Sequence, residues 1–256
     1  ERSLHSFLCC SSHAGQPHAR RPTARPMTGE RKYDVILLDV DGTLLNFDQA
    51  EADGMRVVLR EYGFEPTDEL LEAYHQVNNA YWAAFERGEV TKERLVCQRF
   101  ETFFGSLGKT VDGAQVESLY RRQLDGSAIL IDGAVEICGY LRDRYDLYIV
   151  TNGTSSTQYK RLAASGLDLY VKDIFVSEDA GSQKPQKEYF DYCFSRIPGA
   201  DPSRMLLVGD SLHSDILGGN VAGTDTCWYN PKGKAGESGI RVDYEIRDLR
   251  ELEKIV

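Results

Sequence analysis

The chain has 256 residues, of which 41% are hydrophobic and 27% are charged, and its formal net charge is −10 at pH 7. This length is enough for one large domain, or for a core with a smaller second domain. The negative charge argues against binding to polymeric nucleic acid or to an anionic membrane surface. No apolar run approaches the roughly 18 residues that a membrane span needs.

Residues 1–26 show no sustained helical or strand periodicity and contain three prolines. Four arginines against one acidic residue are typical of a transit peptide, but the segment is only weakly amphipathic and lacks the apolar centre of a secretory signal. We expect a disordered tail, or residues added in front of a natural start at Met27, and we exclude 1–26 from the fold.

The six cysteines stand at positions 9, 10, 97, 138, 193 and 227, and their spacing does not resemble that of a metal site. Only Cys9 and Cys10 are close together in the sequence, and vicinal cysteines rarely form a structural disulfide. We therefore expect free thiols in a reducing compartment and a cytoplasmic protein.

The first predicted strand is followed directly by a pair of aspartates. Val35 to Leu38 is an almost continuous apolar run, which is typical of a strand buried on both faces of a parallel sheet. Asp39 and Asp41 follow at i and i+2, so an extended chain would place both carboxylates on one side of the strand's carboxyl end. Open α/β sheets bind ligands at that edge. The alternative is an Asp-Gly turn whose acids face water.

Residues 48–125 are predicted to form a helical cap domain. Apolar positions at helical spacing predict helices over 49–62, 67–88, 91–104 and 113–124, with no strand pattern between them. These roughly 75 residues far exceed what a simple crossover between two parallel strands needs. We expect the catalytic core to consist of residues 27–47 and 126–256.

Strand and helix patterns alternate through the rest of the chain. Strands are predicted near 147–150, 174–177, 205–208, 225–229 and 243–246, with helices between most of them and a short helix at the C-terminus. This alternation predicts an α/β fold, with a doubly wound, Rossmann-like parallel sheet as the core.

Polar residues follow three of the predicted strands. They are Thr151-Asn152, Lys184 and Asp210, with Asp215 close behind. Each has a simpler explanation: Thr151-Asn152 could cap the next helix, Lys184 could be a solvated loop lysine, and Asp210 could belong to a turn. Because parallel strands end at one edge, we expect these residues to converge with Asp39 and Asp41.

Such a cluster is suited to phosphoryl transfer. The Asp39 carboxylate can attack phosphorus as a nucleophile, and Asp41 can protonate the leaving oxygen and later deprotonate water. Mg²⁺ held by Asp39, Asp210 and the main-chain carbonyl of Asp41 would offset the repulsion between the carboxylates and the phosphate.

The remaining polar residues supply contacts to the phosphoryl oxygens. The Thr151 hydroxyl and the amides around Asn152 would hold these oxygens, and Lys184 would offset charge that develops in the transition state. Asp215 is expected to orient Lys184 or a metal-bound water.

Four segments resemble the motifs of the haloacid dehalogenase (HAD) superfamily. They are Asp39-Val40-Asp41-Gly42-Thr43-Leu44, Thr151-Asn152, Lys184-Pro185, and Gly209-Asp210-Ser211 with Ser214-Asp215. The helical insert resembles the C1 cap of the superfamily, and the acid at position 41 is typical of its phosphatases. The resemblance implies Mg²⁺ dependence, an aspartyl-phosphate intermediate and a cap that closes over the substrate.

Within the superfamily the chain is most similar to pyrimidine 5′-nucleotidases of the YjjG type. The similar segments are 77–82, 98–100, 214–219 and 227–230, whereas Lys184-Pro185-Gln186-Lys187 departs from the Lys-Pro-Asp-Pro common in that group. The likeness implies a nucleoside monophosphate as the small-molecule substrate, with Tyr81 and Trp82 stacking on the base. An aromatic cluster on a helix is, however, more often part of the core packing.

Three alternatives stay open at this point. A sugar-phosphate or phosphoglycolate phosphatase, or a β-phosphoglucomutase-like enzyme, would carry the same motifs. The alternative from another class is a non-catalytic module that binds a phospho-ligand, or a receiver-like module in which Asp39 is phosphorylated only as a signal. A receiver-like module would need neither Asp41 nor a cap. We expect a monomer or a dimer.

Overall fold

The computed structural model describes residues 31–256. The expectations for the tail at 1–26 and for Cys9 and Cys10 therefore lie outside the described residues. Cys97, Cys138, Cys193 and Cys227 are free cysteines, as expected. Within residues 31–256, no helix combines the length and apolar character needed to cross a membrane.

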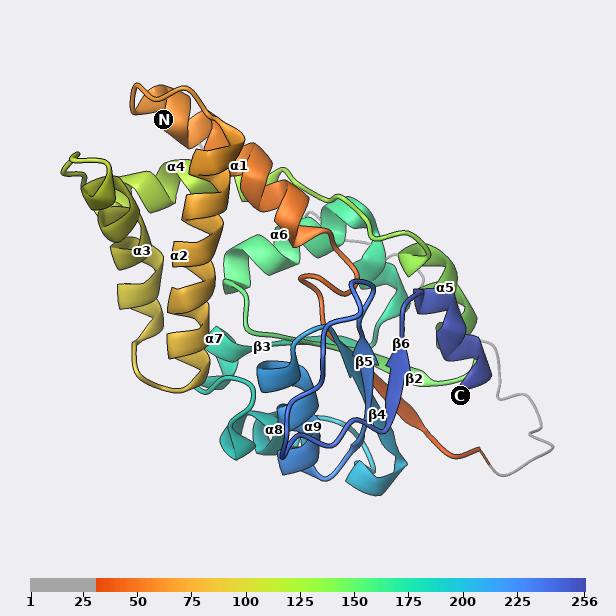
Figure 1. Cartoon of the computed structure of the whole chain (residues 1–256). Helices are drawn as coiled ribbons and strands as arrows, with labels where there is room; N and C mark the ends of the chain where they lie inside the picture. The colour runs from red at the N-terminus through yellow and green to blue at the C-terminus, as the bar shows by residue number, and fades with distance from the viewer. Residues whose placement is uncertain (1–30) are drawn as a thin grey trace, which may run out of the picture. The chain divides into compact units, whose positions relative to one another are not determined.

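Six parallel strands form the central sheet, as the sequence predicts (Figure 1). Their spatial order is β3-β2-β1-β4-β5-β6, and Val35 of β1 is in register with Asp146 of β2 and Met205 of β4. This order is that of a doubly wound Rossmann-type sheet. The strands are β1 (Val35–Leu38), β2 (Asp146–Thr151), β3 (Asp173–Val176), β4 (Met205–Gly209), β5 (Asp225–Tyr229) and β6 (Tyr244–Ile246).

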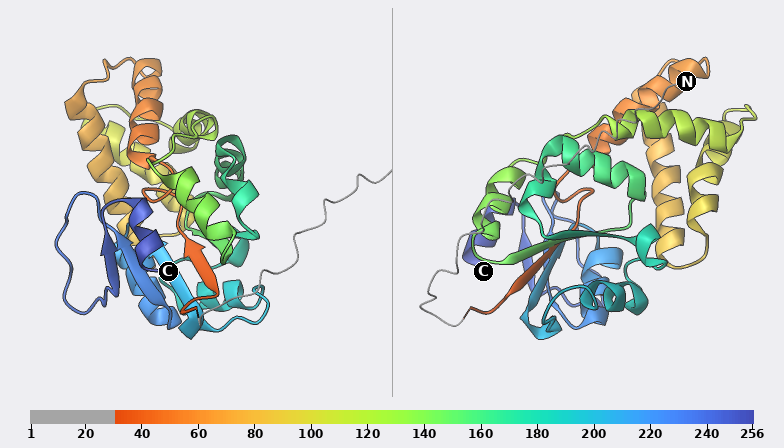
Figure 2. Two further views of the ribbon diagram at one scale, coloured as in Figure 1. Left: turned by 90° about the vertical axis from the view of Figure 1, so that its right-hand side faces the viewer. Right: turned by 180° about the vertical axis from the view of Figure 1, so that it is seen from behind.

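Helices cover both faces of the sheet (Figure 2). Ile36 and Leu38 pack into one apolar cluster, together with α5 (Ala134–Arg142) and α6 (Ser155–Ser165). Val35 and Leu37 pack into a second cluster on the opposite face, together with α8 (Lys187–Phe194). Because alternate residues of β1 enter opposite clusters, the strand is apolar at every position.

Four helices follow the first strand and stand apart from the sheet (Figure 1). Asn46, Thr67, Thr91 and Asp112 each precede one of these helices and accept a hydrogen bond from a backbone N–H of its first turn. An apolar core of their own lies between them, rich in aromatic residues such as Phe100 and Tyr120, which supports the proposed cap. The helices are α1 (Phe47–Glu61), α2 (Asp68–Glu86), α3 (Lys92–Ser106) and α4 (Gly113–Asp125).

Several short elements are not predicted by the sequence patterns. Segments of three or four residues contain too few positions for a helical period to show. They are η1 (Leu167–Tyr170), α7 (Ser177–Ala180) and η2 (Pro202–Arg204). The helix expected between the strands near 205–208 and 225–229 is present as a π-helical turn, η3 (Leu212–Ile216), followed by α9 (Leu217–Ala222). The short C-terminal helix, η4 (Leu249–Lys254), is a 3₁₀ helix.

Candidate active site

The carboxyl ends of β1, β2 and β4 meet at one edge of the sheet. Asp39 directly follows β1, Thr151 ends β2, and Asp210 directly follows β4. Strands β1 and β4 are neighbours, and the chain winds away from this pair in opposite directions. A doubly wound sheet opens a crevice at such a point, where ligands bind.

Lys184 forms the centre of a buried ionic cluster. Its Nζ donates hydrogen bonds to Asp39 Oδ1 at 2.7 Å, to Asp215 Oδ1 at 2.7 Å and to the carbonyl of Val150 at 2.9 Å. Lys184 is 1% exposed and Asp215 is fully buried, so the solvated-lysine alternative is wrong. Three acceptors match the three donors of the ammonium group.

The cluster shifts the pKa values of its members. Burial raises the pKa of Asp39; the Lys184 ammonium opposes that shift, and the Asp215 carboxylate adds to it. Burial alone would lower the pKa of the Lys184 ammonium, but Asp215 and Asp39 raise it more, so the net shift is upward. Lys184 therefore stays charged beside the predicted nucleophile.

A divalent cation fits beside this cluster. Asp39, Asp210 and Asp215 each offer one oxygen, and these three oxygens lie within 4.8 Å of one another. Burial, followed by the charges of Asp39 and Asp215, raises the pKa of Asp210 well above its ordinary value. Asp215 is fully buried, whereas Asp39 and Asp210 directly follow β1 and β4 at the open edge of the sheet, so Asp39 and Asp210 are the better-placed ligands for Mg²⁺.

Gly42 allows Asp210 to approach the loop after β1. Its φ of +86° is unfavourable for other residues, and a Cβ atom there would lie 2.6 Å from Asp210 Oδ2. The glycine that follows the predicted acid pair is therefore needed for a close approach between the ends of β1 and β4.

Thr151 and Asn152 do not cap the next helix, since the N-cap of α6 is Thr154. The side chain of Asn152 makes two hydrogen bonds of 2.9 Å to the backbone of Lys184: Nδ2 donates to the carbonyl oxygen, and Oδ1 accepts from the backbone N–H. The Thr151 hydroxyl oxygen accepts from Gln158 Nε2 at 2.8 Å and from the Gly153 amide at 3.1 Å. The hydroxyl hydrogen of Thr151 is thus available to a bound phosphoryl group.

Two residues of α6 hold Asp41, and the sequence patterns did not reveal them. Gln158 Nε2 donates to Asp41 Oδ2 at 2.8 Å, and Arg161 Nη1 forms an ion pair with Asp41 Oδ1. Both residues are 1% exposed. Their spacing of i and i+3 places them on one face of the helix, but only the fold shows that this polar face is buried against Asp41.

The catalytic cluster opens into a pocket of about 210 Å³ between the sheet and the helical insert. The insert contributes six residues to its wall, which are Phe47, Asp48, Asn78, Asn79, Trp82 and Glu86. Burial raises the pKa of Glu86 to about 7.

The structure brings Trp82, but not Tyr81, to this catalytic pocket. The Tyr81 hydroxyl instead lies 2.8 Å from Thr102 Oγ1 on α3. We therefore leave Tyr81 out of the proposed binding set.

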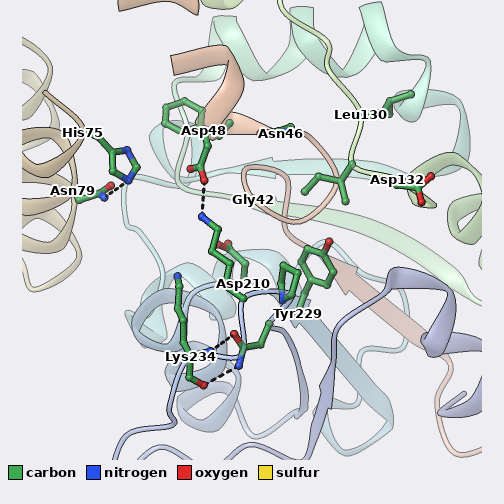
Figure 3. Close-up of a pocket in the computed structure, with 15 residues that line it drawn as sticks. Gly42, Asn46, Asp48, His75, Asn79, Leu130, Asp132, Asp210, Tyr229 and Lys234 are labelled. Carbon is green, nitrogen blue, oxygen red and sulfur yellow. Dashed lines mark hydrogen bonds and ion pairs between the residues drawn. The ribbon is translucent and has the colours of Figure 1, made fainter. Parts of the chain in front are cut away.

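A second cavity, of about 420 Å³, adjoins the catalytic pocket (Figure 3). The two share Gly42, Phe47, Asp48, Asn79 and Asp210. An ion pair of 2.9 Å between Asp48 and Lys232 connects α1 with the loop after β5. The combined space is larger than a phosphate group needs.

Comparison with known proteins agrees with this geometry. The sequence model of a hydrolase family described as haloacid dehalogenase-like hydrolase matches residues 33–223. The chain is 46% identical to the HAD-hydrolase YfnB of Bacillus subtilis, over 88% of this chain and 96% of YfnB.

Two further relatives are described as pyrimidine 5′-nucleotidases. PynA of Streptococcus pneumoniae is 35% identical, over 86% of this chain and 93% of its own length. YjjG of Escherichia coli is 33% identical, over 88% of this chain and 98% of its own length.

The fold also matches a solved structure. The crystal structure of YfnB bound to magnesium, which reveals interdomain movement, has a TM-score of 0.84 with this structure at 47% identity. The match covers 88% of this chain and 99% of that chain.

Proposed function

The chain belongs to the haloacid dehalogenase-like hydrolases, and on that premise we propose that it is a Mg²⁺-dependent phosphatase of pyrimidine nucleoside 5′-monophosphates. The observation that carries the proposal is the buried contact between Lys184 and Asp39 at the edge where Asp210 and Asp41 also lie. The nucleotide preference draws on the similarity to PynA and YjjG.

In the proposed reaction a carboxylate oxygen of Asp39 attacks the phosphorus atom of the substrate. The bond between phosphorus and the ester oxygen breaks, and Asp41 gives its proton to the departing oxygen. A water molecule then attacks the phosphorus of the aspartyl phosphate while Asp41 takes up its proton. The acyl-phosphate bond breaks, which restores Asp39 and releases inorganic phosphate.

The surroundings of Asp39 suit this role. Thr43 Oγ1 donates to Asp39 Oδ2 at 3.1 Å, and Lys184 binds Oδ1, so both carboxylate oxygens are oriented. When bound, Mg²⁺ would be held by Asp39, Asp210 and the Asp41 main-chain carbonyl, and would neutralise charge between the carboxylates and the phosphate. Thr151 and the amides next to it would hold the phosphoryl oxygens.

The space around the site supports a nucleoside as the leaving group. The catalytic pocket and the adjoining cavity share a wall that includes Phe47 and Asn79, and Trp82 contributes an aromatic surface. Aromatic rings of this kind can stack on a planar base. A sugar phosphate or phosphoglycolate would use the same catalytic residues but would gain nothing from the aromatic wall.

Phosphate release from a substrate panel tests the proposal. The panel contains UMP, dUMP, dTMP, AMP, phosphoglycolate and several hexose phosphates, each with and without Mg²⁺. The proposal predicts Mg²⁺-dependent turnover that favours the pyrimidine nucleotides. Preference for a hexose phosphate or phosphoglycolate would retain the chemistry but remove the nucleotidase assignment, and no turnover of any compound would favour a phospho-ligand-binding module.

A further inference from the structure

Three buried hydrogen-bond donors without an acceptor belong to residues around one small cavity. They are Trp82 Nε1, Arg99 Nε and Arg161 Nη2, half of the six such side-chain atoms among residues 31–256. Trp82, Arg99 and Arg161 all line a cavity of about 40 Å³ between α6 and the helical insert. Buried donors are rarely left unpaired, so a group that supplies acceptors would be bound favourably beside these residues.

The carboxylates and the side-chain amide of the cavity wall already accept hydrogen bonds. Asp41 accepts from Gln158 and Arg161, one on each carboxylate oxygen. Glu117 Oε2 accepts from Arg99 Nη2 at 2.6 Å, and its other oxygen is paired with a second arginine. The Gln158 carbonyl accepts from Arg161 Nη1 at 3.2 Å. The wall therefore has donors in excess.

The cavity adjoins the catalytic pocket. The two share Asp41, Phe47, Trp82 and Gly153. A phosphomonoester held at Asp39 would thus extend from Asp41 along the rings of Phe47 and Trp82. Since one water-sized probe occupies about 10–15 Å³, a cavity of about 40 Å³ can receive the edge of a planar ring but not a whole nucleoside.

The Trp82 ring is held in place from the helical insert. The Lys92 ammonium lies 4.3 Å from the centroid of the Trp82 ring and donates a hydrogen bond to the Asn152 carbonyl. This cation–π contact connects the ring to the loop that follows β2. The position of Trp82 Nε1 is therefore fixed before any substrate enters.

We propose that this donor pocket, lined by Asp41, Phe47, Trp82, Arg99, Gln158 and Arg161, binds a carbonyl oxygen of the substrate's pyrimidine base. The inference rests on the proposed nucleotidase function and deepens it. Every pyrimidine base carries a carbonyl at C2, whereas adenine carries none. The acceptors of adenine are ring nitrogens, which lie within a larger ring and do not project as a carbonyl oxygen does. An adenine nucleotide would therefore pair these donors poorly, and a site built to hydrogen-bond a group rejects analogues that lack it.

Substitution of Trp82 by Phe removes the Nε1 donor and keeps an aromatic ring. We expect kcat/KM for UMP to fall about 5-fold to 10-fold, the effect of losing one neutral hydrogen bond, while kcat/KM for ribose 5-phosphate changes less than about 2-fold because that substrate has no base. Tyr62→Phe is the matched control, because it removes a hydroxyl from an aromatic residue of the insert that packs against Phe104, away from the pocket. It should leave both values unchanged.

Sulfur in place of a base carbonyl oxygen tests the same contact from the substrate side, because a thiocarbonyl is a weak acceptor. We expect 2-thio-UMP or 4-thio-UMP to be a poorer substrate than UMP for the wild-type enzyme, and this difference to shrink in Trp82→Phe. Equal kcat/KM for UMP and both thio-nucleotides would overturn the inference and indicate a cavity filled by ordered water. An equal loss on UMP and ribose 5-phosphate in Trp82→Phe would also overturn it. Turnover of ribose 5-phosphate without turnover of any pyrimidine nucleotide would remove the proposed function and this inference together.

Discussion

Replacement of Lys184 by Met should destabilise the protein strongly. The variant retains two buried carboxylates, Asp39 and Asp215, that lose the ammonium bonded to each of them at 2.7 Å. Removal of one partner from a buried ion pair costs about 3–5 kcal/mol of the free energy of unfolding. For a chain of this size, that loss lowers the melting temperature by about 6–20 °C.

The loss should depend on pH. Burial already raises the pKa of Asp39, and removal of the opposing ammonium raises it further. The folded variant then binds more protons than the unfolded chain, so its stability falls as the pH rises through the folded pKa of Asp39. The difference from wild type should be larger at about pH 8.5 than at about pH 5.5.

Urea unfolding followed by circular dichroism measures both effects, with EDTA present so that no metal contributes. Lys187→Met is the matched control, since this lysine is 65% exposed and pairs with Asp191 on the surface; its expected cost is below about 0.5 kcal/mol. Adding Asp215→Asn to Lys184→Met should recover part of the lost stability. If Lys184→Met costs less than about 1 kcal/mol at both pH values, the buried cluster does not carry the stability assigned to it.

Three further predictions concern residues around the site. Arg161→Met should lower kcat/KM for UMP about 10-fold, because Asp41 loses its ion pair. The control is Lys160→Met, which removes a surface ion pair on the same helix and should change kcat/KM less than about 2-fold. Equal effects of the two substitutions would refute a role for Arg161 in holding Asp41. Glu86→Gln should lower KM for UMP about 3-fold at about pH 8.5 and leave it unchanged at about pH 5.5. The reason is that the Glu86 carboxyl, with its pKa of about 7, repels phosphate only when it is ionised. An equal change in KM at both pH values would contradict this. Gly42→Ala should raise the Mg²⁺ concentration for half-maximal activity at least about 10-fold, because the Cβ atom of the alanine would overlap the Asp210 carboxylate. An unchanged Mg²⁺ dependence would exclude Asp210 as a ligand.

The strand ends that carry the site can be predicted from the sequence because buried parallel strands are apolar at every position. Val35 to Leu38 and Met205 to Gly209 end sharply at Asp39 and Asp210, and the sheet order places these ends side by side. The convergence of Asp39, Thr151 and Asp210 follows from topology. Lys184 lies beyond α7 rather than at a strand end, and two hydrogen bonds between its backbone and the Asn152 side chain connect it to the site.

The contributions of helices to the site could not be predicted in the same way. Consecutive residues on a helix point about 100° apart, so Tyr81 and Trp82 face different directions, and the sequence does not indicate which of them faces the pocket. Gln158 and Arg161 have the composition of a solvated helix face, yet they are buried because α6 lies over Asp41. Both cases depend on how a helix is rotated about its axis, which tertiary packing sets.

The most direct test of the central claim compares phosphate release from UMP by the wild-type protein and by Asp39→Asn, each with Mg²⁺ and with EDTA. The melting temperature of each protein is measured as well, so that a loss of activity through unfolding is separated from a loss of chemistry. The account predicts turnover by the wild type with Mg²⁺, and a loss of at least about 1,000-fold in Asp39→Asn or when the metal is removed. Turnover by Asp39→Asn at more than about a tenth of the wild-type rate would show that Asp39 is not the nucleophile.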